Sequence, residues 1–215
     1  MSIRALILDF GEVLVRPQSA EVVERMAQLV SLSTADFQRR YWSGREAYDR
    51  GLAAGEYWRG VVEGLDIPQP ETERVVADLI AADYESWTVY RPEVWQVAAE
   101  FKAAGGKTAI LSNGVPEIIG RVKTERDLSP FFDAIVVSYE VGCAKPEPRI
   151  YGICLDMLKV AAESALFVDD RIENLEAAAG LGIQTLHFTG NASVDALRAR
   201  LGLPANASGR AFTLR

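Results

Sequence analysis

The sequence contains a series of short apolar segments without alternating polar positions. Four of them occupy residues 5–8, 108–111, 134–137 and 165–168, and a weaker one occupies residues 185–188. A strand with one face in water alternates apolar and polar residues, whereas a continuous apolar run is typical of a strand buried on both faces. These runs therefore predict the strands of a parallel sheet that is covered by helices on both sides.

Helical patterns separate the later apolar runs. Segment 94–101 has apolar residues at i, i+3, i+4 and i+7, and the glycines at 105 and 106 provide a stop signal. Segments 151–158 and 175–179 show the same kind of pattern, and the second one ends at Gly180. Strands that alternate with helices are typical of βαβ units. We therefore predict an α/β fold with a doubly wound, mainly parallel sheet.

Residues 16–88 interrupt this alternation, because their apolar residues recur at helical spacing throughout. Ser33 precedes Asp36 by three residues, which is the spacing of a capping box with Asp in place of the usual Glu. Trp42, Trp58 and Trp87 lie in this block, and we expect most of these aromatic side chains to form a small helical core. The pattern predicts a helical cap domain (16–88) inserted into a core domain (1–15 and 89–215), above the carboxyl end of the first strand. A polar loop after Leu203 and a candidate edge strand at 211–214 complete the prediction.

Polar residues follow the carboxyl ends of the predicted strands or lie in the loops just beyond them. In chain order they are Asp9, Ser112, Asn113, Gly114, Lys145, Asp169 and Asp170. Each has an ordinary explanation when taken alone, as a helix cap, a turn residue or a solvated surface residue. In an open α/β sheet, however, ligands bind in the crevice outside the carboxyl ends of the strands. Because all of these residues lie at or just beyond the carboxyl ends of strands, we predict that they form a single site.

Composition excludes several functional classes. The 215 residues carry a formal net charge of −7 and contain no Lys/Arg run, so we expect no nucleic acid and no membrane among the partners. The N-terminal apolar run is too short for a secretory signal, and no stretch approaches the roughly 20 apolar residues of a membrane span. Two cysteines are too few for a disulfide framework, which favours a reduced, cytoplasmic setting. A histidine-rich metal site is excluded because His187 is the only histidine.

Four motifs in this order resemble the haloacid dehalogenase-like (HAD) superfamily: LILDFG (6–11), ILSNG (110–114), KPEPRIY (145–151) and FVDDRIEN (167–174). The block 16–88 is similar in place and size to the C1-type cap of that family. The resemblance implies a Rossmann-like core and a hydrolase that acts on phosphate monoesters. Its cofactor would be Mg²⁺, and its product would form through an aspartyl-phosphate intermediate.

The resemblance also assigns roles to the predicted site residues. Asp9 would be the nucleophile, and the metal ligands would be Asp9, the backbone carbonyl of Gly11, and Asp170. Asp169 and Asn174 would support these ligands from behind or through water. The phosphoryl oxygens of the substrate would be bound by the Ser112 hydroxyl, the backbone N–H groups of Asn113 and Gly114, and the Lys145 ammonium.

One position departs from the family pattern. Most phosphatases of this kind carry a second Asp two residues after the nucleophile, as the acid/base for the leaving group, and this sequence has Gly11 there. The backbone carbonyl remains available, but the proton donor is lost, and such a loss costs roughly 10²–10⁴ in rate. Glu12 is the neighbouring candidate for that role, and a solvent-facing Glu12 is the alternative. A leaving group of low pKa, such as an anomeric hydroxyl, would suffer least.

Three hypotheses for function follow. The first is a Mg²⁺-dependent phosphatase that acts on a small, sugar phosphate-like metabolite. The second is a non-catalytic or very slow protein that binds a phosphorylated ligand. The third is a metal-free haloacid dehalogenase-type hydrolase, against which the Asp169-Asp170 pair speaks, because two adjacent anions invite a cation. Specificity is expected from the cap, where Arg45, Tyr48 and Arg50 are candidates to face the crevice, and a solvated helix face is the alternative that we favour for any one of them. The sequence is compatible with a monomer or a homodimer.

Overall fold

The computed structural model describes residues 2–205, so the candidate edge strand at 211–214 lies outside the described residues. The five apolar runs form one parallel sheet with the strand order β3-β2-β1-β4-β5. The strands are β1 (Ala5–Leu8), β2 (Lys107–Ser112), β3 (Ala134–Val137), β4 (Ala165–Asp169) and β5 (Gln184–His187). The predicted fold class is confirmed, and β1 lies at the centre of the sheet.

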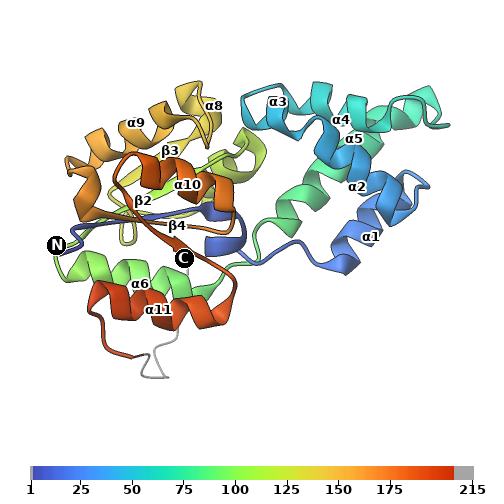
Figure 1. Ribbon diagram of the computed structural model, residues 1–215. Helices are drawn as coiled ribbons and strands as arrows, with labels where there is room; N and C mark the ends of the chain where they lie inside the picture. Colours follow the sequence, from blue (N-terminus) through green and yellow to red (C-terminus); the bar gives the residue numbers. More distant parts are fainter. Residues whose placement is uncertain (1, 206–215) are drawn as a thin grey trace.

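Helices cover both faces of this sheet, as Figure 1 shows. One face packs against α6 (Pro92–Ala103) and α11 (Asn191–Leu201), and the other packs against α9 (Pro148–Leu158) and α10 (Ile172–Gly180). Successive side chains of a strand point to opposite faces, so Leu6 and Leu8 belong to the first core while Ala5 and Ile7 belong to the second. All four side chains are fully buried, which explains why β1 shows no polar alternation.

Short elements complete the α/β part of the molecule. They are the helices α7 (Arg121–Glu125) and α8 (Ser138–Val141) and the single turns at Phe10–Leu14, Pro116–Gly120 and Ala162–Ser164. The chain passes from β1 to β2 and β3 on one side, and then returns to β4 and β5 on the other. This reversal places a topological switch point beside β1, where α/β proteins of this type bind their ligands.

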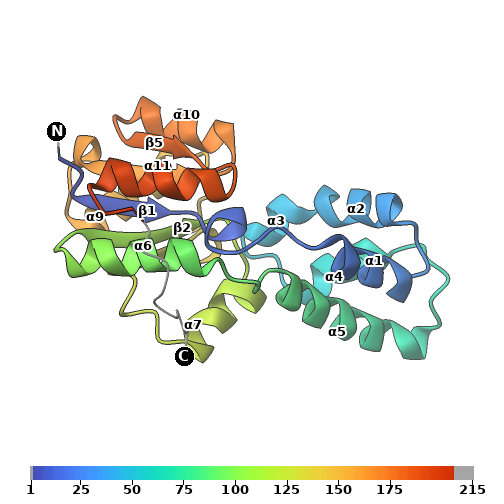
Figure 2. The ribbon, with the colours of Figure 1, turned by 90° about the horizontal axis from the view of Figure 1, so that it is seen from below.

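The segment between β1 and α6 is helical, as its apolar spacing predicted. It contains α1 (Ala20–Leu29), α2 (Thr34–Ser43), α3 (Arg45–Asp49), α4 (Ala54–Val62) and α5 (Gln69–Ser86). Figures 1 and 2 show these helices gathered beyond the carboxyl end of β1. We call residues 16–88 the helical insertion. The predicted N-cap is confirmed, because the Ser33 hydroxyl accepts a hydrogen bond from the backbone N–H of Asp36 (3.1 Å).

Aromatic side chains form the core of the helical insertion, as expected. Trp58 is fully buried, and the ring of Tyr48 stacks on that of Tyr57 with 4.2 Å between the ring centroids. Trp42 is the exception, because 49% of its surface remains exposed. The role of this residue must therefore be sought outside the core of the insertion.

Two chain segments connect the helical insertion to the sheet, and they are bonded to each other. Val15 forms an antiparallel bridge with Tyr90, and the backbone N–H of Arg16 donates to the carbonyl of Val89 (2.7 Å). The chain therefore leaves and re-enters the α/β part at one place. Within residues 2–205, no helix combines the length and apolarity that crossing a bilayer would require.

Candidate active site

The loop after β1 places Asp9 at the carboxyl edge of the sheet. The Asp9 backbone N–H donates to the carbonyl of Val168 on β4 (2.9 Å), and its carboxylate accepts from the backbone N–H of Phe10 (2.6 Å). The chain then makes a single wide turn, in which Glu12 has a φ of 53°. This left-handed conformation is uncommon for a residue other than glycine. The turn directs the chain around the carboxylate of Asp9, so that Gly11 and Glu12 line the same pocket as Asp9.

Lys145 lies between two carboxylates in the interior. Its Nζ is 2.9 Å from Oδ1 of Asp9 and 2.6 Å from Oδ2 of Asp169, and 1% of its side chain is exposed. Burial opposes the charged form of an ammonium, yet the two carboxylates raise the pKa of Lys145 above its ordinary value. Lys145 therefore remains a cation that is fixed beside the oxygen atoms of Asp9.

Asp169 is completely buried and holds Lys145 in place. Its carboxylate also accepts hydrogen bonds from the backbone N–H of Arg171 (2.8 Å) and from the side-chain amide of Asn174 (3.1 Å). These contacts occupy Asp169 with protein donors. Asp170, the next residue, is half-buried and lines the pocket.

The carboxylates of Asp9, Asp169 and Asp170 form an acidic cluster, in which one oxygen atom from each residue lies within 4.8 Å of the other two. Burial is the main reason why the pKa of Asp9 is raised to about 7, and the two other carboxylates add to it against the opposing effect of Lys145. Burial, followed by the charge of Asp169, raises the pKa of Asp170 to about 6. Three carboxylates facing one ammonium leave an excess of negative charge. A set of hard oxygen donors with such an excess fits a divalent cation such as Mg²⁺.

Asn113 joins two of the loops that build the site. Its side-chain oxygen accepts from the backbone N–H of Lys145 (2.8 Å), and its side-chain amide donates to the Lys145 carbonyl (2.8 Å). This pair of hydrogen bonds fixes the backbone of Lys145 relative to the end of β2. Ser112 ends β2 directly before Asn113, is 2% exposed, and lines the pocket.

Gly114 lines the pocket as well, but its backbone N–H does not point as the sequence led us to expect. That group donates to the hydroxyl of Ser138 (3.1 Å) and is therefore engaged within the protein. A Cβ at position 114 would lie 2.4 Å from Cδ1 of Ile119, so any other residue there would require the Ile119 side chain to shift. Ser138 directly follows the third predicted strand, but the sequence did not indicate its contact with Gly114.

Most of the predicted site residues line one pocket of about 390 Å³, whereas Asp169 is completely buried and does not line it. From the core these are Asp9, Gly11, Ser112, Asn113, Gly114, Lys145 and Asp170. The helical insertion closes the opposite side with Trp42, Arg45, Asp49 and Trp87. Of these four, the sequence singled out only Arg45 as a candidate to face the crevice. The structure places Arg45 in the pocket. It also places Trp42, Trp87 and Asp49 there, which the sequence had not indicated.

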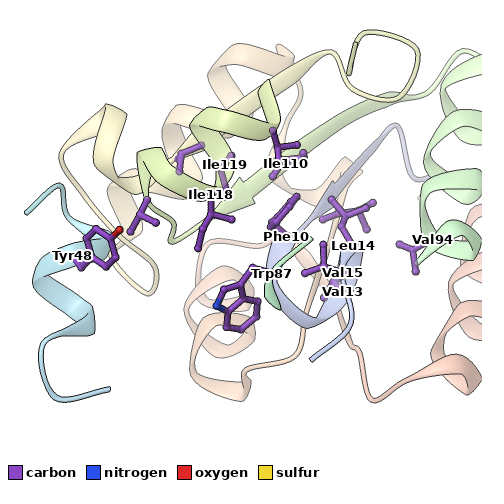
Figure 3. Packing of buried hydrophobic residues seen from close by; sticks show 14 of the residues in the cluster. Phe10, Val13, Leu14, Val15, Tyr48, Trp87, Val94, Ile110, Ile118 and Ile119 are labelled. Atoms are coloured by element: carbon purple, nitrogen blue, oxygen red, sulfur yellow. The ribbon is translucent and has the colours of Figure 1, made fainter. Parts of the chain in front are cut away.

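Trp87 occupies the space that faces Gly11. If Gly11 carried a Cβ, that atom would lie 3.6 Å from Cζ3 of the indole. Figure 3 shows Trp87 beside the loop that carries Phe10, with Ile118 and Ile119 nearby. An apolar indole therefore faces the position where most phosphatases of this kind carry the acid/base Asp. Glu12, the residue next to Gly11, also lines the pocket.

Arg45 is buried and paired with two carboxylates. Its Nε lies 3.0 Å from Oδ1 of Asp49, and its Nη1 lies 3.6 Å from Oδ2 of Asp83. The charge of Arg45 is therefore neutralised within the helical insertion.

Tyr48 and Arg50 contact the core outside the pocket, in place of the crevice position proposed for them. The Tyr48 hydroxyl donates to Oε2 of Glu117 (3.1 Å), and Nη2 of Arg50 lies 2.6 Å from Oε1 of Glu147. Between them, the carbonyl of Asp49 accepts a hydrogen bond from the Ser138 hydroxyl. We call residues 48–50 the clasp, because they fasten the helical insertion to the loops that carry Gly114 and Lys145.

Known proteins resemble this chain over different parts of their lengths. The chain is 36% identical over 121 residues to acyl-CoA dehydrogenase family member 10 of Mus musculus, which covers 56% of this chain and only 11% of the mouse protein. It is 24% identical over 192 residues to a phosphatase of Mycobacterium tuberculosis, covering 86% of each. It is 27% identical over 196 residues to an (S)-2-haloacid dehalogenase of Burkholderia cepacia, covering 87% of this chain and 83% of the dehalogenase.

A solved structure has the same fold. A HAD family enzyme of Bacteroides thetaiotaomicron, in complex with magnesium and inorganic phosphate, matches with a TM-score of 0.72 and 19% identity, over 88% of this chain and 96% of that chain. The sequence of residues 3–182 matches the haloacid dehalogenase-like hydrolases. The protein therefore belongs to the haloacid dehalogenase-like hydrolase family.

Proposed function

We propose that this protein is a Mg²⁺-dependent phosphatase, which hydrolyses the phosphate monoester of a small, sugar phosphate-like metabolite through an aspartyl-phosphate on Asp9. The observation that carries this proposal is the convergence of Asp9, Lys145 and Asp170 in one pocket, from three segments that are far apart in the chain. The similarity to a phosphatase over 86% of both chains supports the same reaction class.

The donor set fits the proposed metal. Asp169 is occupied by Lys145, Arg171 and Asn174, which leaves the carboxylates of Asp9 and Asp170 and the Gly11 carbonyl as the proposed ligands. When bound, Mg²⁺ would neutralise the repulsion between the phosphoryl oxygens and the carboxylates. Mg²⁺ takes few carboxylates and keeps several waters, which agrees with a pocket that offers two of them.

The chain's own residues would divide the reaction into two displacements. An Oδ atom of Asp9 attacks phosphorus, the bond from phosphorus to the ester oxygen breaks, and the leaving oxygen takes up a proton from Glu12 or from solvent water. A water molecule then attacks phosphorus and gives up a proton to the group that donated the first one, and the bond to Asp9 breaks to release inorganic phosphate. Lys145 and the Ser112 hydroxyl would hold the phosphoryl oxygens, and they matter most where negative charge builds up.

The missing acid at position 11 favours a second candidate function, a protein that binds a phosphorylated ligand with little or no turnover. Gly11 offers no proton, and the Trp87 indole faces it. The distinguishing experiment is a screen of sugar phosphates, nucleotides and phosphorylated acids with Mg²⁺, followed by rapid acid quenching with radiolabelled substrate. Hydrolysis by the wild type, together with a radiolabelled phosphoryl group trapped on the wild-type protein but not on the Asp9→Asn variant, supports the phosphatase. If compounds bind, but none of them is hydrolysed or leaves a radiolabelled phosphoryl group on the protein, the result supports the binding protein.

The resemblance to a haloacid dehalogenase calls for one further measurement. A metal-free dehalogenase would release halide from 2-haloacids equally well with and without EDTA. The acidic cluster opposes that function, because three carboxylates beside one ammonium repel a carboxylate substrate unless a cation is present. We therefore expect no halide release from (S)-2-chloropropionate, and metal-independent release would favour the dehalogenase.

A further inference from the structure

The charges and apolar surfaces on the side of the pocket opposite Asp9 restrict the leaving group. The side chains there come from the helical insertion and from the turn after β2: Trp42, Arg45, Asp49, Trp87, Ile118 and Ile119. If the protein is the phosphatase proposed above, the leaving group must lie against these side chains while its phosphate lies beside Asp9. We infer that the substrate is a monophosphate whose leaving group is an uncharged ring with an apolar face.

Among residues 2–205, every cation that lines the pocket already has anionic partners. Lys145 contacts Asp9 and Asp169. Arg45 is 8% exposed and contacts Asp49 and Asp83, at 3.0 Å and 3.6 Å. No cation on the side of the helical insertion is therefore left to compensate a second phosphate or a carboxylate.

Arg171 is the third cation of the pocket in the part of the chain that the structure describes, and it lies at the rim. Its Nε donates to Oε1 of Glu173 (2.7 Å), and 61% of its side chain is exposed. At such exposure water and salt screen its charge, so it adds little attraction for an anion inside the pocket. In addition, the carboxylates of Glu12 and Asp49 line the pocket and would repel a second anionic group.

The uncharged part of the pocket wall is aromatic. Trp42 keeps 49% of its surface exposed although it lies on the pocket, and Trp87 closes the space in front of Gly11. An indole face gains contact energy against the C–H face of a ring, whereas a short open chain covers much less of it. The pocket volume of about 390 Å³ lies near the lower end of the roughly 300–1,000 Å³ usual for small-molecule sites, which favours one ring over a dinucleotide.

The test compares substrates that differ by one group. α-Glucose 1-phosphate and α-glucuronic acid 1-phosphate share the ring and differ by a carboxylate, while glycerol 3-phosphate lacks the ring. We expect kcat/KM to fall at least about tenfold from the neutral to the acidic sugar, because like charges meet in a site that excludes water. Equal values, or a preference for the acidic sugar, would overturn the inference.

Two variants test the two halves of the argument. Asp49→Asn removes one negative charge and one partner of Arg45, so it should narrow the difference between the two sugar phosphates by about tenfold. Asp156→Asn, at an exposed position on α9 outside the pocket, is the matched control and should leave that difference unchanged. Trp42→Ala should raise KM for glucose 1-phosphate by about tenfold and leave glycerol 3-phosphate unchanged, with Met157→Ala as its exposed control. A loss of activity without this change of selectivity would contradict the inference.

Binding separates this inference from the proposed function. The Asp9→Asn variant, which lacks the nucleophile, is titrated with the same sugar phosphates in the presence of Mg²⁺, and tryptophan fluorescence reports occupancy of the pocket. Tighter binding of the neutral sugar, without turnover by the wild type, would refute the phosphatase and retain the leaving-group inference. Tighter or equal binding of the acidic sugar would refute the inference even if the wild type hydrolyses phosphate esters.

Discussion

Asp9 is ionised at a cost to the stability of the metal-free protein, and replacing it by Asn should reveal this cost. Burial and the neighbouring carboxylates of Asp169 and Asp170 raise the pKa of Asp9 from 3.8 to about 7, although Lys145 opposes them. One pKa unit corresponds to about 1.4 kcal/mol, so ionised Asp9 destabilises the folded, metal-free protein by about 4 kcal/mol relative to the neutral acid. Asn resembles that neutral acid in shape and never ionises.

The sign of the pH dependence follows from the direction of the shift. Because the folded state holds the Asp9 proton up to a higher pH than the unfolded chain does, the contribution of Asp9 to wild-type stability falls as the pH rises from about 4 to 7. The Asp9→Asn variant lacks this loss. Without metal, the variant should be more stable than the wild type by about 2 kcal/mol at pH 5 and about 4 kcal/mol at pH 8.

Urea denaturation in EDTA at these two pH values measures the difference. Adding Mg²⁺ at pH 8 should narrow it, because an ion bound by the folded wild type stabilises that protein more than a variant that lacks one carboxylate. A variant less stable than the wild type at pH 8, or a difference that is the same at both pH values, would refute the reasoning. The same variant should show no phosphatase turnover.

Three further predictions concern the metal, the proton donor and the clasp. Protons compete with Mg²⁺ for Asp9 and Asp170, whose pKa values lie near 7 and 6. Calorimetry should therefore show Mg²⁺ affinity falling by about tenfold or more from pH 7.5 to pH 5.5, and an affinity independent of pH would exclude these ligands. If Glu12 donates the leaving-group proton, Glu12→Gln should slow glycerol 3-phosphate hydrolysis by about 10²-fold and p-nitrophenyl phosphate hydrolysis much less; an equal effect on both would clear Glu12 of that role. Ser138→Ala removes the hydroxyl that joins Asp49 and Gly114, so it should raise KM by roughly tenfold and leave metal affinity unchanged; an unaltered KM would show that this link does not position the substrate.

The fold followed from the sequence because the decisive signals are local. The continuous apolar runs at 5–8 and 134–137 coincide with β1 and β3, and the three other strands differ from their predicted bounds by one residue at one or both ends. Parallel strands place their carboxyl ends at one edge of the sheet. The approach of Asp9, Lys145 and Asp170 therefore needed no knowledge of side-chain packing.

The rest of the site depends on contacts between parts of the chain that no periodic pattern relates. Asp49 and Trp42 line the pocket only because the clasp fixes the helical insertion against the core. The same holds for Gly114, whose N–H was expected to face the phosphate and instead meets Ser138. The sequence does not distinguish a tryptophan that lines a pocket, such as Trp42, from one buried in a helical core. The residue type and the helical spacing are the same in the two situations.

The paired connections at residues 15–16 and 89–90 determine how the helical insertion can move. Two separate tethers would allow it to swing and twist in any direction. The two connections are bonded to each other by the bridge from Val15 to Tyr90 and the hydrogen bond from Arg16 to Val89. They therefore form one hinge, which favours rotation of the helical insertion about a single axis. Such a rotation would carry the indole of Trp87, which lies just before this hinge, only a short way from Gly11, while the far end around Asp49 would travel much further. Departure of the product would therefore begin at the edge remote from the hinge.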